Sequence, residues 1–207
     1  MVGTINKKHL LEIFIIYLLF PCLIIFFNLT KYFLLILILI CLITLVCCPL
    51  KKKEFSKRFN KKFFLFVSFV LFLIITLFSF LDKNTFFLGF IKELPNIWFI
   101  VFIIYPTFSV IPQEIIYRHF FFQRYGYLFK NENISIIFNS SLFAFGHIIF
   151  LNLEAVFISF LGSIIFSYSY LKESLLMCIF LHILAGQLIF LSGLRYYFLE
   201  GTISNIN

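Results

Sequence analysis

Residues 51–81 read KKKEFSKRFNKKFFLFVSFVLFLIITLFSFL, a basic segment that runs directly into an apolar one. The apolar part, Phe63 to Leu81, is long enough to cross the hydrocarbon core of a bilayer, which takes roughly 20 residues as a helix. The basic part, residues 51–62, holds seven of the 17 Lys and Arg residues of the chain. Lys and Arg clustered beside a span mark the cytoplasmic side of a membrane. This stretch therefore predicts a membrane protein and orients it.

The composition of the whole chain supports the same class. Of the 207 residues, 62% are hydrophobic, 13% are charged and 34 are Phe. Soluble domains are about half apolar, and a soluble core of this size could not bury so many rings. The net charge of +8 is concentrated in the basic segment, which indicates membrane topology rather than a nucleic-acid surface. The five cysteines lie in or at the ends of apolar runs without metal-binding spacing, so we interpret them as small hydrophobic residues.

Further apolar runs lie on both sides of this stretch. Pro112 should end one helix and start the next, because proline lacks the N–H that a helix interior needs. The expected helices are 10–27, 32–50, 63–81, 97–111, 113–129, 134–151, 155–171 and 174–194. The sequence thus predicts an all-α, polytopic membrane helical bundle of about eight transmembrane helices.

The expected units are N-terminal spans over 1–111, which include the basic loop 51–62, a four-helix core over 112–194 and a short tail over 195–207. The basic loop places the N-terminus in the cytoplasm and the chain in the cell membrane as a multi-pass protein. Gln113 and Glu114 then fall at the cytoplasmic start of the fifth helix, His147 near the cytoplasmic end of the sixth, and His182 midway along the eighth. Their similar depth is the main reason for preferring eight spans.

Ionisable residues inside spans cost roughly 2.5–3.5 kcal/mol each on insertion scales and usually face partners within the bundle. Glu114 and Arg118 are four residues apart, so their side chains can meet on one helix face. One interpretation is a purely structural ion pair. Another adds His147 and His182, because a carboxylate and an imidazole together can activate water. A third is a zinc site, since two histidines and a carboxylate are a common zinc ligand set.

Two other ionisable residues of the same region, His119 and Arg124, are expected at the membrane interface. Long or amphipathic polar side chains near helix ends commonly reach toward the headgroups while their stems stay in the apolar layer. We therefore leave both residues out of the candidate site.

The order of these residues resembles the CPBP family of intramembrane proteases, which includes the CAAX-type prenyl endopeptidases and bacterial proteins linked to bacteriocin processing and self-immunity. Its E-E-x-x-x-R motif is similar to Gln113 through Arg118. Its F-x-x-x-H motif is matched by Phe143 through His147, and its H-x-x-x-N motif in part by His182 through Gly186. The chain departs from the pattern at Gln113, which stands for the first Glu, and at Gly186, which stands for the Asn.

The resemblance implies that Glu114 and His147 prepare a water for attack on a peptide carbonyl and that His182 stabilises the negative charge. Arg118 and Gln113 would support them. The family has been described as metal-dependent and as glutamate-dependent, so the resemblance leaves open a zinc ion on Glu114, His147 and His182 or no cofactor.

The leading hypothesis is an endopeptidase acting on a membrane-associated peptide or protein tail near the cytoplasmic face, with the lipid bilayer and no nucleic acid as partner. The alternatives are a catalytically inactive relative that acts as a bacteriocin-immunity or scaffold protein, and a small proton-coupled transporter that uses the same buried groups. The lack of an inverted repeat counts against the transporter.

Overall fold

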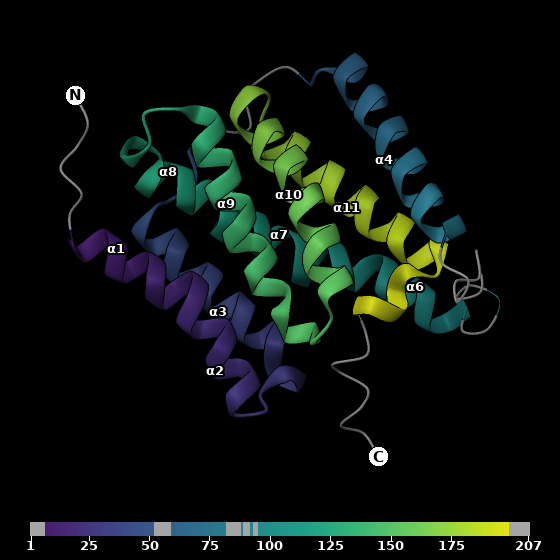
Figure 1. Ribbon diagram of the computed structural model, residues 1–207, viewed down its shortest axis with the longest axis horizontal. Helices are drawn as coiled ribbons and strands as arrows, with labels where there is room; N and C mark the ends of the chain where they lie inside the picture. The colour runs from purple at the N-terminus through teal and green to yellow at the C-terminus, as the bar shows by residue number, and fades with distance from the viewer. Residues whose placement is uncertain (1–6, 52–58, 82–87, 89–91, 93–94, 199–207) are drawn as a thin grey trace.

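The computed structural model describes residues 7–51, 59–81, 88, 92 and 95–198, and every regular element among them is helical (Figure 1). The first half contains α1 (Lys7–Ile13), η1 (Phe14–Leu19), α2 (Phe20–Phe26), η2 (Thr30–Tyr32), α3 (Phe33–Cys47), α4 (Lys61–Leu81) and α6 (Pro95–Ile104). There follow η4 (Tyr105–Val110), α7 (Ile111–Glu114), η5 (Ile115–Phe120), α8 (Phe121–Tyr125), η6 (Gly126–Leu128), α9 (Glu132–Gly146), η7 (His147–Phe150), α10 (Leu153–Lys172), α11 (Leu175–Ser192) and η8 (Leu194–Phe198).

Within the described residues, seven helices are long and apolar enough to cross a membrane. They are Lys7–Phe26, Thr30–Cys47, Lys61–Leu81, Trp98–Leu128, Glu132–Phe150, Leu153–Lys172 and Leu175–Ser192. The prediction of a helical membrane bundle is confirmed, and six expected spans coincide with these to within a few residues. Residues 52–58 of the basic loop and residues 199–207 of the tail lie outside the described residues.

The predicted break at Pro112 is wrong, so the expected fourth and fifth helices are one. Trp98–Leu128 is a continuous helix of 31 residues that runs obliquely across the bundle from α6 to α8 (Figure 1). The π-helical turns η4 and η5 lie on either side of Pro112, and such wider turns accommodate a proline ring and a missing hydrogen bond. Gln113 and Glu114 therefore lie inside this helix rather than at its cytoplasmic start. The division of the chain at residue 111 stays a prediction.

Two groups of helices enclose this long helix. On one side, α9, α10, α11 and α4 pack side by side in that order (Figure 1). On the other, η1 of the N-terminal hairpin packs against α9, and α3 packs against η5. The Tyr17 hydroxyl fixes the hairpin by donating to the carbonyl of Ile116 at 2.8 Å, where both groups are buried.

Outward-facing side chains are apolar, as a lipid environment requires. Only 17% of the α4 span is buried inside the protein, and Phe66, Phe69 and Phe80 are exposed on it. A large exposed apolar surface of this kind would be unstable in water and is satisfied by acyl chains. The buried faces also carry small and polar residues, among them several serines and Asn139, which allow close helix contact and hydrogen bonds between helices.

Asn139 illustrates these interhelical bonds. Its amide donates from Nδ2 to the carbonyl of Tyr117 at 2.6 Å and accepts from Ser167 Oγ at 2.9 Å. One fully buried side chain thereby links α9 to both η5 and α10.

Asn139→Ala should lower the free energy of unfolding by about 1–3 kcal/mol, because it leaves a buried carbonyl and a buried hydroxyl without their partner. The measurement is reversible unfolding of the purified protein in mixed detergent with increasing dodecyl sulfate. Ser141→Ala is the matched control, since Ser141 is exposed and bonds only to its own helix. Equal stability of the two variants would contradict the role given to Asn139.

Candidate active site

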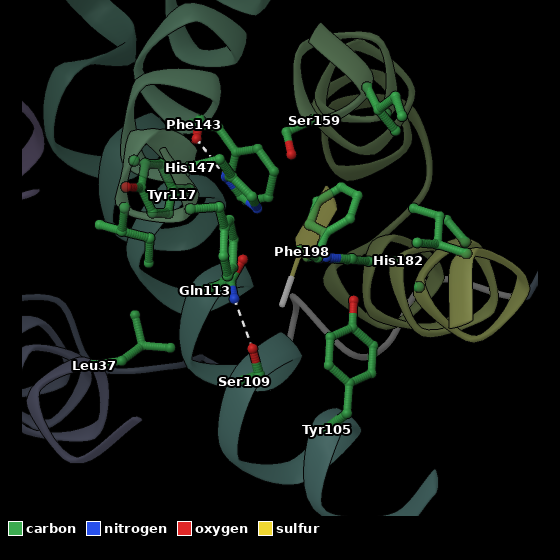
Figure 2. A pocket seen from close by; sticks show the side chains of 18 of the residues that line it. Leu37, Tyr105, Ser109, Gln113, Tyr117, Phe143, His147, Ser159, His182 and Phe198 are labelled. Carbon is green, nitrogen blue, oxygen red and sulfur yellow. Dashed lines mark hydrogen bonds between the residues drawn. The ribbon is translucent and has the colours of Figure 1, made fainter. Parts of the chain in front are cut away.

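A cavity of about 390 Å³ lies between the long helix, α9, α10 and α11 on one side and apolar residues of α2, α3 and α4 on the other. Most of its wall is apolar. The described residues that line it include no Asp, Glu, Lys or Arg. The residues that carry polar groups into this cavity are all labelled in Figure 2. They are Tyr105, Ser109, Gln113, Tyr117, His147, Ser159 and His182. An apolar cavity with a few converging polar groups is the usual form of a small-molecule or peptide site.

Gln113 reaches the cavity from α7. Its Nε2 donates to Ser109 Oγ at 2.8 Å, which fixes the orientation of the amide (Figure 2). Its Oε1 is buried and has no hydrogen-bond partner among the described residues. A buried carbonyl oxygen of this kind has two lone pairs available, so it can accept a hydrogen bond from a molecule in the cavity.

His147 faces Gln113 from the end of α9 (Figure 2). Its Nδ1 lies 2.8 Å from the carbonyl of Phe143. A carbonyl can only accept, so Nδ1 carries the proton of this bond. In the neutral ring, Nε2 is then left as a bare acceptor, which is the form that can take a proton from water.

Glu114 lies behind the cavity, not on its wall, and its side chain is fully buried. Its Oε1 is 2.6 Å from Nδ1 of His182, and its Oε2 is 3.2 Å from Nε of Arg118. The thiol of Cys178 donates to Oε2 at 2.6 Å. The carboxylate is therefore fully engaged by the protein, and its nearest connection to the cavity is the His182 ring.

Arg118 completes this buried network. Its Nη2 donates to Ser163 Oγ of α10 at 2.8 Å, and its guanidinium lies 4.3 Å from the centre of the Phe143 ring. His182 in turn stacks on Phe166, with 4.6 Å between ring centres. One ion pair thus connects the long helix to α9, α10 and α11.

The structure brings the sequence-predicted residues together in two layers. Gln113, His147 and His182 line the cavity, whereas Glu114 and Arg118 form the layer behind it. The predicted contact between Glu114 and Arg118 is present. The expected outward reach of His119 is wrong, because its side chain is 1% exposed and its Nε2 lies 2.9 Å from the carbonyl of Cys48.

Sequence reasoning missed Tyr105, Ser109 and Cys178. Tyr105, Ser109 and Gln113 follow one another at intervals of four residues, so a search for polar residues on one helix face would have found them. The expected break at Pro112 hid that pattern by assigning these residues to different helices. Cys178 carried no signal, because a cysteine in an apolar run is normally a packing residue.

A zinc ion on Glu114, His147 and His182 does not fit this arrangement. Within the described part of the chain, no three His, Cys, Asp or Glu side chains are grouped so that they could hold a metal ion. A metal on Glu114 would also have to displace the hydrogen bonds with His182 and Cys178 and disturb the ion pair with Arg118.

A family model described as type II CAAX prenyl endopeptidase Rce1-like matches residues 95–186. This match supports the resemblance to the CPBP family of intramembrane proteases. The match covers somewhat less than half of the chain, and it contains the entire polar site from Tyr105 to Gly186. The resemblance seen in the sequence is thereby confirmed. No curated protein and no solved structure matches the chain.

Arg118→Met should lower the free energy of unfolding by about 3–5 kcal/mol, because it leaves the buried Glu114 carboxylate without its counter-charge. The double variant Glu114→Leu/Arg118→Met should be more stable than Arg118→Met alone, since it removes both charges. The same dodecyl sulfate titration measures both.

Arg124→Met is the matched control for a lost arginine. Arg124 pairs with Glu12 at 2.6 Å, but both side chains are partly exposed, so its loss should cost at most about 1 kcal/mol. If Glu114→Leu/Arg118→Met were less stable than Arg118→Met alone, the unpaired Glu114 carboxylate would not be the cause of the stability lost in Arg118→Met.

Proposed function

We propose that the chain is an intramembrane endopeptidase in which His147 and Gln113 bind and activate a water molecule. The observation that carries the proposal is the pair of acceptors at the cavity wall, Gln113 Oε1 and His147 Nε2. A water with one hydrogen toward each acceptor has a lone pair left for attack on a carbonyl carbon. The match to a protease family supports hydrolysis as the reaction.

His147 acts as the general base in this scheme. Nε2 takes a proton from the water as its oxygen attacks the peptide carbonyl, and the same proton later passes to the leaving amine. The Phe143 carbonyl keeps Nδ1 protonated and so stabilises the imidazolium that forms between these steps. Gln113 cannot take a proton, and its role is to orient the water.

Glu114 is a positioning residue in this proposal and acts through His182. Its carboxylate accepts from His182 Nδ1 and fixes the orientation of the ring, as the carboxylate of a Ser-His-Asp triad does. When His182 is protonated on both nitrogens, its Nε2 can donate to the negative charge that develops on the substrate oxygen. The resemblance implied that Glu114 and His147 prepare the water. The position of Gln113 on the cavity wall favours Gln113 in place of Glu114 for that step.

The substrate that this site favours is an apolar, membrane-associated peptide or the lipidated tail of a protein. The cavity wall is apolar and uncharged, so a charged soluble peptide would lose hydration there without gaining ion pairs. The family description adds prenylated tails as the first class to test. With the basic segment in the cytoplasm and a single helix over Trp98–Leu128, His147 at the end of α9 lies toward the opposite face, so the proposal does not keep the access near the cytoplasmic face that eight spans predicted.

The test uses purified protein in proteoliposomes with internally quenched peptides that carry either a farnesylated C-terminal cysteine or an unmodified one. The wild type should cleave the farnesylated peptide, and His147→Ala should reduce kcat by about 10²–10⁴, the usual contribution of a general base. His9→Ala is the matched control, because His9 bonds to Tyr127 and does not line the cavity. Full activity of His147→Ala would refute the mechanism.

A second candidate, a non-catalytic relative that binds a partner in the membrane, is favoured by one observation. The position that reaches the cavity holds an amide, and the neighbouring carboxylate is fully engaged elsewhere. In such a protein the wild type would cleave nothing, and a binding or immunity phenotype would survive His147→Ala. Gln113→Glu would then be the variant expected to gain cleavage.

A further inference from the structure

Tyr105 is a cavity residue to which the mechanism above gives no role. It is the first residue of η4, and its ring reaches across the cavity toward α11 (Figure 2). The centres of the Tyr105 and His182 rings are 6.3 Å apart, in an edge-to-face arrangement. Phe190 supports the other side of the phenol ring, with 5.3 Å between ring centres. The ring is therefore held in one position beside His182.

Gly186 provides the space that this ring occupies. A Cβ built on Gly186 would collide with Oη, Cε1 and Cζ of Tyr105, so the phenol lies directly against the α11 backbone. Gly186 is one helical turn beyond His182 and faces the same side of α11. The Tyr105 hydroxyl thus stands next to His182 at the place where a side chain of residue 186 would otherwise project.

The Tyr105 hydroxyl makes no hydrogen bond to any residue that the structure describes. Buried tyrosine hydroxyls usually have a partner, and this one faces the cavity. A donor held by packing and aimed at a ligand space costs no reorganisation when negative charge forms there, which is how oxyanion holes act.

We infer that Tyr105 is a catalytic residue that donates a hydrogen bond to the substrate oxyanion, together with His182. The inference rests on the proposed peptidase function. When the water oxygen bonds to the carbonyl carbon, the π electrons of C=O move to the carbonyl oxygen, and His147 holds the proton lost by the water. The Tyr105 O–H donates to that oxygen and keeps its own proton. When the C–N bond breaks, the electron pair returns to form C=O, and the leaving amine takes the proton from His147.

The packing of Tyr105 against Gly186 also accounts for the glycine that stands in place of the Asn of the H-x-x-x-N motif. The amide that the resemblance leads us to expect at position 186 is replaced by glycine, and the phenol of Tyr105 fills that space. An asparagine at 186 and the present Tyr105 side chain are mutually exclusive, because the Cβ of residue 186 alone collides with the ring. The chain therefore supplies the second donor from the long helix instead of from α11.

Tyr105→Phe removes only the hydroxyl and tests the inference directly. Its kcat on the peptide that the wild type cleaves should fall about 10²–10³-fold with little change in KM, as for removal of one oxyanion donor. Affinity for a phosphinic peptide that mimics the tetrahedral intermediate should fall by a similar factor. Tyr127→Phe, at an exposed tyrosine that bonds to His9, is the matched control and should keep wild-type values.

Variants at position 186 separate chemistry from folding. Gly186→Ala should lower kcat as much as Tyr105→Phe does, because the added Cβ displaces the Tyr105 ring. In a Tyr105→Ala background, where that ring is absent, Gly186→Ala should lower kcat no further. In that background, Gly186→Asn should recover kcat at least about tenfold by supplying an amide donor. Gly126→Ala is the glycine control, since its Cβ would meet no atom closer than 3.9 Å.

The outcomes distinguish the inference from the function on which it rests. Wild-type kcat in Tyr105→Phe with an inactive His147→Ala overturns the role of Tyr105 and leaves the peptidase standing. Failure of Gly186→Asn to restore any activity to folded Tyr105→Ala also overturns it. A wild type that cleaves no peptide refutes the proposed function itself and the inference with it.

Discussion

The Glu114 carboxylate is an anion with no exposed surface in a bundle surrounded by lipid, and the arrangement of the helices follows from how it is compensated. Neither water nor acyl chains can stabilise it, so the protein has to supply every partner. Those partners come from the same helix through Arg118 and from α11 through His182 and Cys178. Arg118 extends the network to Ser163 of α10, which fixes three helices against one another around a single charge pair.

This compensation also determines how the cavity can work. Because the ion pair lies behind His182, the cavity wall presents neutral polar groups and apolar carbon. A substrate carbonyl can enter without displacing a charge or its hydration. In the proposed reaction the charge pair would act by fixing the orientation of the His182 ring. The π-helical turns η4 and η5 place Tyr105, Gln113 and Arg118 along one long helix.

Periodicity and composition were sufficient for the membrane class, for six of the helices and for the contact between Glu114 and Arg118. Each of these depends on local sequence, namely apolar runs of sufficient length and a spacing of four residues. The continuation of the helix through Pro112 depends on neighbouring helices that keep the chain straight where an isolated peptide would break. Other features depend on contacts between segments that are distant in the sequence, and no local pattern records them. They are the side to which Glu114 faces, the bond from the Cys178 thiol and the packing of the Tyr105 phenol against Gly186.

The replacement of a glutamate by Gln113 takes on a physical meaning in this setting. Arg118 is already engaged by Glu114, so a second carboxylate at position 113 would face the apolar cavity without a counter-charge. An amide avoids that cost and still offers an oxygen that accepts from water. In the proposed mechanism proton transfer then falls to His147, whose imidazolium would form beside the oxyanion. The positive charge on His147 and the negative charge on the substrate oxygen would thus arise and vanish together. Both would form in a low-dielectric cavity, where hydrogen bonds from fixed donors are strongest.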